Sequence, residues 1–216
     1  TVKLTVLCDN PAFLIRLVKE QIQKRLNNFT QKELPNKVFT LLIVGYLCKI
    51  KQSNKVHKGC VYSVVGINIL SQREFHDFHT FFAAKNKSTT YKVFQDLIDR
   101  GIGKVAVVVS DNFSGINDAI ETAFPYTRHQ LCYLRLMRNC KKYLSKPDNQ
   151  GFVKELQSIK LATGQQFGAL CSKYQHSYKS FIANISSKKD YYLIFLNFNE
   201  QIGKFIYATN AVISNL

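Results

Sequence analysis

The sequence contains an unbroken valine-rich apolar run, residues 105–109, which ends at Ser110 and Asp111. A short β-branched run that follows a glycine and ends in polar residues predicts a strand buried on both faces. The segment after it carries apolar residues at helical spacing, namely Ile116, Ala119, Ile120 and Ala123. Asp111 is therefore expected at the carboxyl end of a buried strand, the edge at which open α/β sheets bind ligands.

Two interpretations of Asp111 follow from this position. A carboxylate that faces a crevice could hold a divalent cation, because such ions prefer hard oxygen ligands. An Asp or Ser before a helix is also the usual N-cap, and the local sequence by itself favours the cap.

The composition limits the class of protein and its partners. The chain has 216 residues, of which 46% are hydrophobic, so it can bury a core. Its net charge of +16 favours a nucleic-acid partner over an acidic membrane surface, since the basic residues are spread along the chain. The most apolar stretch, residues 39–48, is about half as long as a membrane-spanning helix, and no phosphate-binding glycine loop follows a strand.

The six cysteines form no C-x-x-C pair, which argues against a zinc ribbon and predicts free buried thiols.

The sequence predicts three strands in succession, then a helix, a strand, a helix, a strand and a helical block. The strands are expected at 38–50, 60–70, 73–83, 105–109 and 126–131, with a polar turn at 53–59. The helices are expected at 91–100, 116–123 and within 132–187, with a helix-like pattern again at 201–216 and an aromatic run at 191–198. Three antiparallel strands followed by parallel α/β units is the arrangement of an RNase H-like domain.

The expected organisation has four parts. Residues 1–33 form a basic helical segment, residues 34–131 the RNase H-like core, residues 132–198 an all-helical insertion, and residues 199–216 a helix that returns to the core.

Three motifs carry a resemblance to a known family. They are VSDNFSGINDAIETAFP, HQLCYLRLMRN and IYATNAVISNL, and they occur in that order at family-like separations. The sequence resembles the mutator-type transposases of bacterial insertion sequences, which have V-S-D-G-x-x-G, A-I-E-x-x-F-P, Q-L-C-x-x-H-x-x-R-N and I-Y-T-T-N-A-I-E-S-L-N. The similarity runs from about Leu14 to the end of the chain.

The resemblance implies DNA cutting and joining by two Mg²⁺ or Mn²⁺ ions that three carboxylates hold. Asp111 corresponds to the second carboxylate. The implied partner is the DNA at the ends of the element, with a possible homo-oligomer and neither a membrane nor a small-molecule substrate. The implied location is intracellular, in the cytoplasm or nucleoid if the host is a bacterium.

The sequence departs from the family at the other metal-binding positions. The first carboxylate aligns with Val44 and the last with Ile213, and neither side chain offers a lone pair to a metal. In the C-x-x-H motif, which supports the metal site, Cys132 is kept and Arg135 replaces the His. One carboxylate holds Mg²⁺ weakly, so the chain is expected not to cut DNA by the family mechanism; whether it is an enzyme stays open.

Basic residues on two helical segments are the candidates for phosphate contact. They are Arg135, Arg138, Lys141 and Lys142 in the insertion, and Arg16 and Lys19 in the first segment. The alternative is a solvated surface that keeps the protein soluble.

Two further groups of polar residues are expected to have no catalytic role. His76 and His79 flank Asp77, but on a regular strand they would point to opposite faces and could not share a metal. Asp118 and Glu121 are expected on the solvated face of a helix.

Two rival hypotheses remain. An active transposase would have to recruit replacement carboxylates, from Glu74, Asp77, Asp190 or Glu200. The other rival is a non-catalytic, domesticated module that binds nucleic acid or protein.

Overall fold

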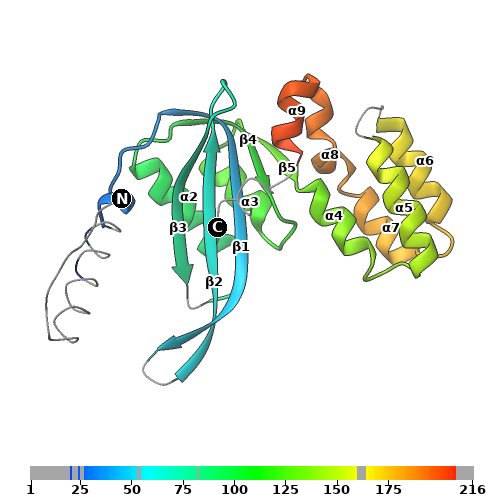
Figure 1. The fold of residues 1–216 in the computed structure, drawn as a ribbon, viewed down its shortest axis with the longest axis horizontal. Helices are drawn as coiled ribbons and strands as arrows, with labels where there is room; N and C mark the ends of the chain where they lie inside the picture. The colour runs from blue at the N-terminus through cyan, green and yellow to red at the C-terminus, as the bar shows by residue number, and fades with distance from the viewer. Residues whose placement is uncertain are drawn as a thin grey trace, which may run out of the picture.

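The computed structural model describes residues 20, 24, 27–52, 55–81, 83–159 and 164–207. A five-stranded mixed sheet forms its centre, with the strand order β3-β2-β1-β4-β5 (Figure 1). The strands are β1 (Lys37–Gln52), β2 (Lys55–Ile67), β3 (Arg73–Phe81), β4 (Lys104–Ser110) and β5 (Arg128–Leu131). The first three are antiparallel and β4 and β5 are parallel to β1, which confirms the predicted α/β topology.

The helices connect the parallel strands and then follow the sheet. They are α2 (Lys87–Asp99), α3 (Ile116–Ala123), α4 (Tyr133–Cys140), α5 (Lys146–Ser158), α6 (Gly164–Tyr174), α7 (Lys179–Ser186), α8 (Lys189–Tyr192) and α9 (Glu200–Ile206). The helical block that the sequence predicted after residue 132 is confirmed. The aromatic run at 191–198 forms the end of α8 and a short 3-10 helix, Ile194–Asn197.

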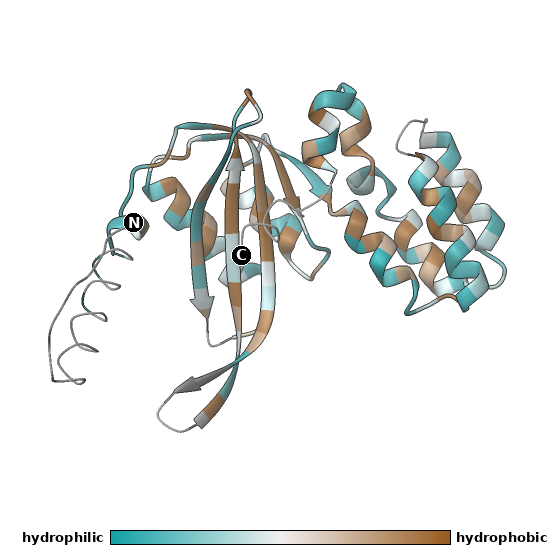
Figure 2. Cartoon of the chain, viewed as in Figure 1, coloured by the Kyte–Doolittle hydropathy of each residue, from teal (hydrophilic) through white to brown (hydrophobic). Residues whose placement is uncertain are grey.

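The sheet separates two hydrophobic cores. Alternate residues of β1 point to opposite faces, so Leu41 and Ile43 pack with α2 and α3 while Leu42 and Val44 pack on the other face. The second core continues from the sheet into the helices from α4 to α9. The central strands are accordingly mostly hydrophobic in Figure 2.

The β1–β2 hairpin differs from the sequence prediction. Residues 53–59 were expected to form a turn, but β2 begins at Lys55, because backbone pairing continues out to Gln52 and Lys55. Residues 55–59 are therefore part of a strand and not of a turn. The polar side chains of residues 53–59 suggested a loop. A two-stranded ribbon can also carry polar side chains, because no neighbouring strand covers it.

Helix α2 begins earlier than the expected residue 91. Asn86 caps it in a reciprocal arrangement: the Asn86 side chain accepts a hydrogen bond from the backbone of Thr89, and the Thr89 hydroxyl accepts one from the backbone of Asn86. The helix ends before Gly101, which has a left-handed φ of 119°.

Other predictions concern residues that are only partly described. Only residues 27–30 of the expected N-terminal helix are described as a continuous helical segment, and Arg16, Lys19 and Ile213 lie outside the described residues. Five of the six cysteines are described and none of these five forms a disulfide; four are buried, as predicted, whereas Cys48 is partly exposed. None of the described helices is both long and apolar enough to cross a membrane.

A buried histidine joins β5 to its neighbours. His129 contacts the Ser110 hydroxyl through Nε2 at 2.8 Å and the Asn117 side-chain oxygen through Nδ1. Burial lowers the pKa of His129 to about 4, so the ring is neutral at physiological pH.

The pKa of His129 predicts a loss of stability in mild acid. Below pH ~6.5 the unfolded chain binds a proton at this position, whereas the folded chain does not until the pH nears 4, so unfolding becomes easier as pH falls through this window. At pH 5 the expected loss is about 2 kcal/mol relative to pH 7.5. Urea unfolding at both pH values should show a smaller difference for His129→Gln than for the wild type. His176→Gln, at an exposed position, should leave the difference unchanged.

Candidate functional site

Asp111 lies where the parallel strands end. It follows the last residue of β4, and Ser110 pairs with Ile43 of β1 on one side and with Leu131 of β5 on the other. The backbone N–H of Cys132 donates to the carbonyl of Ser110 at 2.8 Å, so the start of α4 is tied to the same edge. Asp111 is only 5% exposed. The structure thus places Asp111 at the edge of the sheet, as the sequence predicted.

The N-cap interpretation of Asp111 is wrong. Helix α3 begins at Ile116, and its N-cap is Gly115, which has a left-handed φ of 79° and makes no side-chain cap bond. Asp111 lies four residues earlier and its carboxylate turns elsewhere. The residues between Asp111 and α3 form a turn. The sequence did not predict this turn, because glycine at an N-cap gives only a weak signal.

Two cations surround the Asp111 carboxylate. Arg135, in the first turn of α4, places Nε 2.8 Å from Oδ1, and Lys85, from the loop before α2, places Nζ 3.8 Å from Oδ2. Within the described residues, neither carboxylate oxygen accepts a hydrogen bond of normal geometry. Charge therefore holds the carboxylate more than aligned hydrogen bonds do.

The protonation of this group reflects the same balance. Burial raises the pKa of Asp111, while Arg135 and Lys85 act against that rise because they stabilise the ionised carboxylate. Burial in turn lowers the pKa of Lys85, and the charge of Asp111 opposes this. The three groups form one coupled charge cluster.

Among the described residues, the other side chains that the sheet brings to this edge are not acidic. Val44 is one residue beyond Ile43 on β1, as Asp111 is one residue beyond Ser110 on β4, so the two are neighbours on the same face. Val44 is completely buried. Tyr46 is next on this face, and the charges of Arg135 and Asp111 both affect its pKa, which burial raises.

A polar cleft opens beside Asp111. Its volume is about 460 Å³, and it lies between the sheet edge and helices α4 and α7. Its charged lining residues are Asp111, Lys85, Arg135 and Lys142. Lys188 adds a further cation, since its Nζ donates to the side chain of Asn112, another lining residue, at 3.2 Å. The cleft is therefore positively charged in spite of Asp111.

Comparison with known sequences then identifies the family. The family profile described as "Transposase, Mutator family" matches residues 5–214, nearly the whole chain. The chain belongs to the Mutator family of transposases. The family that the sequence motifs suggested is thus confirmed.

Individual relatives agree with this assignment. The chain is 24% identical over 208 residues to the transposase for insertion sequence element IS1201 of Lactobacillus helveticus, which covers 94% of this chain and 56% of that protein. It is 21% identical over 200 residues to the transposase for IS905 of Lactococcus lactis, with 90% and 50% covered. The chain thus spans about half the length of these relatives.

More distant similarities add less. The transposase for IS256 in transposon Tn4001 of Staphylococcus aureus is 24% identical over 141 residues, which is 65% of this chain and 36% of that protein. A solved structure of NurA aligns with 91% of this chain and 46% of that chain at 12% identity, but its TM-score of 0.18 is too low to argue for a shared fold.

The residues at the sheet edge do not fit a two-metal site. Val44 has no donor atom, and Arg135 and Lys85 bring two positive charges within 4 Å of the Asp111 carboxylate. A divalent cation bound to Asp111 would be repelled by both. Ile213, where the family has its last carboxylate, lies outside the described residues.

The acidic residues that could replace the missing ligands do not gather around Asp111. Among the described residues, the group of three or more potential ligands that lie close together is Asp77, His79 and Asp96, which excludes Asp111. Glu74 instead pairs with Lys32, while Asp190 and Glu200 lie in the first turns of α8 and α9. The described part of the chain therefore gives no support to recruited carboxylates.

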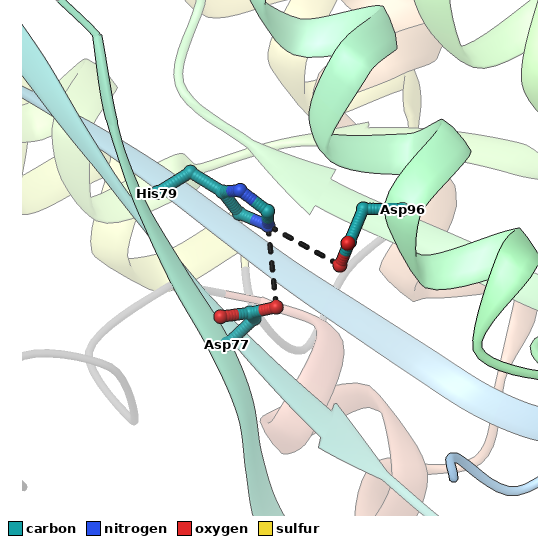
Figure 3. A group of neighbouring side chains, drawn as sticks. All are labelled: Asp77, His79 and Asp96. Atoms are coloured by element: carbon teal, nitrogen blue, oxygen red, sulfur yellow. Dashed lines mark ion pairs between the residues drawn. The ribbon is translucent and has the colours of Figure 1, made fainter. Parts of the chain in front are cut away.

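The Asp77 group lies on the opposite face of the sheet, against α2 (Figure 3). Nε2 of His79 is 3.3 Å from Oδ2 of Asp77 and 3.6 Å from Oδ2 of Asp96. Arg100 pairs with both carboxylates and also donates to the backbone carbonyls of residues 29, 32 and 76. Its guanidinium thus already supplies a cation to the group and ties β3 to the end of α2.

The argument that placed His76 and His79 on opposite faces is wrong for this strand. A β-bulge lies opposite Val64 and Val65, and His76 is the extra residue. His76 packs over Gly66, where a Cβ would lie 1.9 Å from its Nε2. The bulge lets His76 and Asp77 both be buried, although the two histidines still do not share one ligand group among the described residues.

The remaining site predictions fall on exposed positions. Arg138, Lys141 and Lys142 are exposed along and just after α4, as a phosphate-binding face requires. Asp118 and Glu121 are exposed on α3, as predicted, and Asp118 pairs with Lys87 at 3.6 Å. Sequence analysis missed Lys85 and Tyr46 because nothing in their local sequence links them to Asp111.

The contact between Asp111 and Arg135 predicts a measurable coupling. Arg135→Met leaves a buried carboxylate with one cation fewer, so urea unfolding should show a loss of about 1–2 kcal/mol, reduced because the Arg135 side chain is 34% exposed. Asp111→Asn should remove most of the cost of adding Arg135→Met in a double-mutant cycle. Lys141→Met, at an exposed position just after α4, should have almost no effect. Additive losses in the cycle would contradict the coupling.

Proposed function

We propose that this chain is a DNA-binding domain of a Mutator-family transposase that does not cut DNA. The ion pair between Arg135 and Asp111 is the observation that carries this proposal. A metal ion could use the carboxylate only if it displaced Arg135 and Lys85, and it would find no second carboxylate on β1 at Val44. Divalent-metal chemistry is therefore lost, although the scaffold around it is kept.

The topology supports an RNase H-like core for this domain. Three antiparallel strands lead into two parallel α/β connections, and the family's second carboxylate follows β4. In this proposal the core spans residues 34–131, the helical insertion spans 132–198, and residues 1–33 and 199–216 flank them.

DNA binding rests on charge and on the shape of the cleft. The net charge of +16 attracts polyanions, and the cleft beside Asp111 presents Lys85, Arg135 and Lys142 to a phosphate backbone. Two of these cations, Lys85 and Arg135, lie beside Asp111, the residue that corresponds to a metal ligand in the family. The cleft could therefore hold the backbone without hydrolysing it.

A cleavage assay tests the loss of catalysis. With duplex DNA that carries the ends of the matching element and either Mg²⁺ or Mn²⁺, we expect neither nicked nor joined products. Thermal unfolding should also be unchanged by millimolar Mg²⁺, since no site gains binding free energy. A metal-dependent product that disappears in Asp111→Asn would overturn the proposal.

Fluorescence anisotropy with duplex DNA tests the cleft. Lys142→Glu reverses the charge at its edge and should weaken binding about tenfold or more at 100 mM salt, with a shallower salt dependence. Lys104→Glu is the control: it reverses an exposed charge at the amino end of β4, whereas Asp111 and the cleft lie at the carboxyl end. It should weaken binding much less. Equal effects of the two reversals would indicate nonspecific charge attraction, and absence of DNA binding by the wild type would favour a protein-interaction module.

A further inference from the structure

The β1–β2 hairpin extends beyond the sheet as a two-stranded ribbon. Pairing of β1 with β4 ends at Ile43, and pairing of β2 with β3 begins at Cys60, whereas β1 and β2 stay paired to Gln52 and Lys55. We call residues 47–59 the ribbon; in the part of the chain that the structure describes, no third strand pairs with it. Figure 1 shows the ribbon as an arm that projects from the body of the domain.

The ribbon carries positive charge only. Its sequence contains Lys49, Lys51, Lys55 and Lys58, and there is no acidic residue anywhere from residue 34 to residue 73. Elsewhere in the chain lysines often have acidic partners, such as Lys87 with Asp118 and Lys173 with Glu155. The ribbon's own sequence offers no such partner.

The strand register concentrates this charge on one face. Lys49 and Lys58 are direct cross-strand partners, and both are exposed. Like charges that lie directly opposite each other destabilise a strand pair. An anionic partner would remove this repulsion, whereas the isolated protein retains it.

Two apolar side chains lie on the same face. Leu47 and Val56 occupy positions in register with Lys49 and Lys58, and they are 69% and 64% exposed. The two lysines lie between them, so they form no continuous apolar patch that could enter a membrane. Apolar contacts that flank a pair of cations instead suit the sugars and base edges of a nucleic-acid groove, whose rims are phosphates.

We propose that the ribbon is a DNA-contacting arm that lies in the major groove of duplex DNA. In this arrangement Lys49 and Lys58 contact phosphates, and Leu47 and Val56 contact the groove wall. The major groove admits a two-stranded β-ribbon, and the six ribbon residues of β1 give the arm a reach of roughly 20 Å. The inference rests on the proposed DNA-binding function, because it names a second element that contacts the DNA.

Duplex binding by a pair of matched double variants tests the arm. Lys49→Gln/Lys58→Gln should weaken binding at least tenfold and reduce the slope of log K against log salt by about 2. The control, Lys92→Gln/Lys104→Gln, removes two exposed lysines on α2 and β4 and should change affinity less than threefold. Without DNA, the ribbon variant should unfold at the same or a higher temperature than the wild type, because the repulsion is gone.

A second variant tests the apolar contacts separately. Leu47→Ser/Val56→Ser should weaken binding while the salt slope stays that of the wild type, since no charge is removed. Methylation of major-groove N7 atoms by dimethyl sulfate should be reduced by the wild type and restored by the ribbon variant. If Lys49→Gln/Lys58→Gln protects the N7 atoms as well as the wild type does, the ribbon does not lie in the major groove.

The outcomes separate this inference from the proposed function. If the wild type binds duplex DNA and the ribbon and control variants bind equally well, the arm is overturned while DNA binding by the cleft stands. If the wild type does not bind DNA, both fail. Binding to phosphatidylserine vesicles that only the ribbon variant loses would then identify a membrane surface as the partner and overturn DNA.

Discussion

The contact of Asp111 with Arg135 joins the two halves of this structure. Asp111 belongs to the sheet and Arg135 to the first helix after it, and the contact is mostly shielded from water. A buried carboxylate without a counter-charge is costly, so the helical block must deliver a cation to this edge. In this chain the guanidinium of Arg135 supplies that cation, and the ammonium group of Lys85 adds a second.

The sheet makes this arrangement possible because it is a wall shared by two cores. One face packs against α2 and α3, and the other continues into the helices after β5. Asp111 is on the second face, next to Val44, and His129 ties β5 to β4 through Ser110, the residue before Asp111. The neutral ring of His129 adds no charge to this edge, so the cations from outside the sheet set its electrostatics.

The distribution of acidic residues explains where positive charge remains. Asp77 and Asp96 form ion pairs with Arg100, and several surface carboxylates form ion pairs with lysines. In the cleft, Asp111 faces three basic lining residues, and the ribbon sequence has lysines but no acidic residue. Both regions therefore carry an excess of positive charge.

The sequence by itself determined the order of strands and helices, the edge position of Asp111 and the family, because buried valine runs, helical periodicity and motifs are local signals. It did not determine the length of the β1–β2 ribbon, since pairing between strands can continue through polar residues, or the bulge that buries His76. Above all it could not link Lys85 to Asp111, which lies 26 residues further along the chain. Only tertiary packing decides which charges share a buried site, because that depends on distances through space.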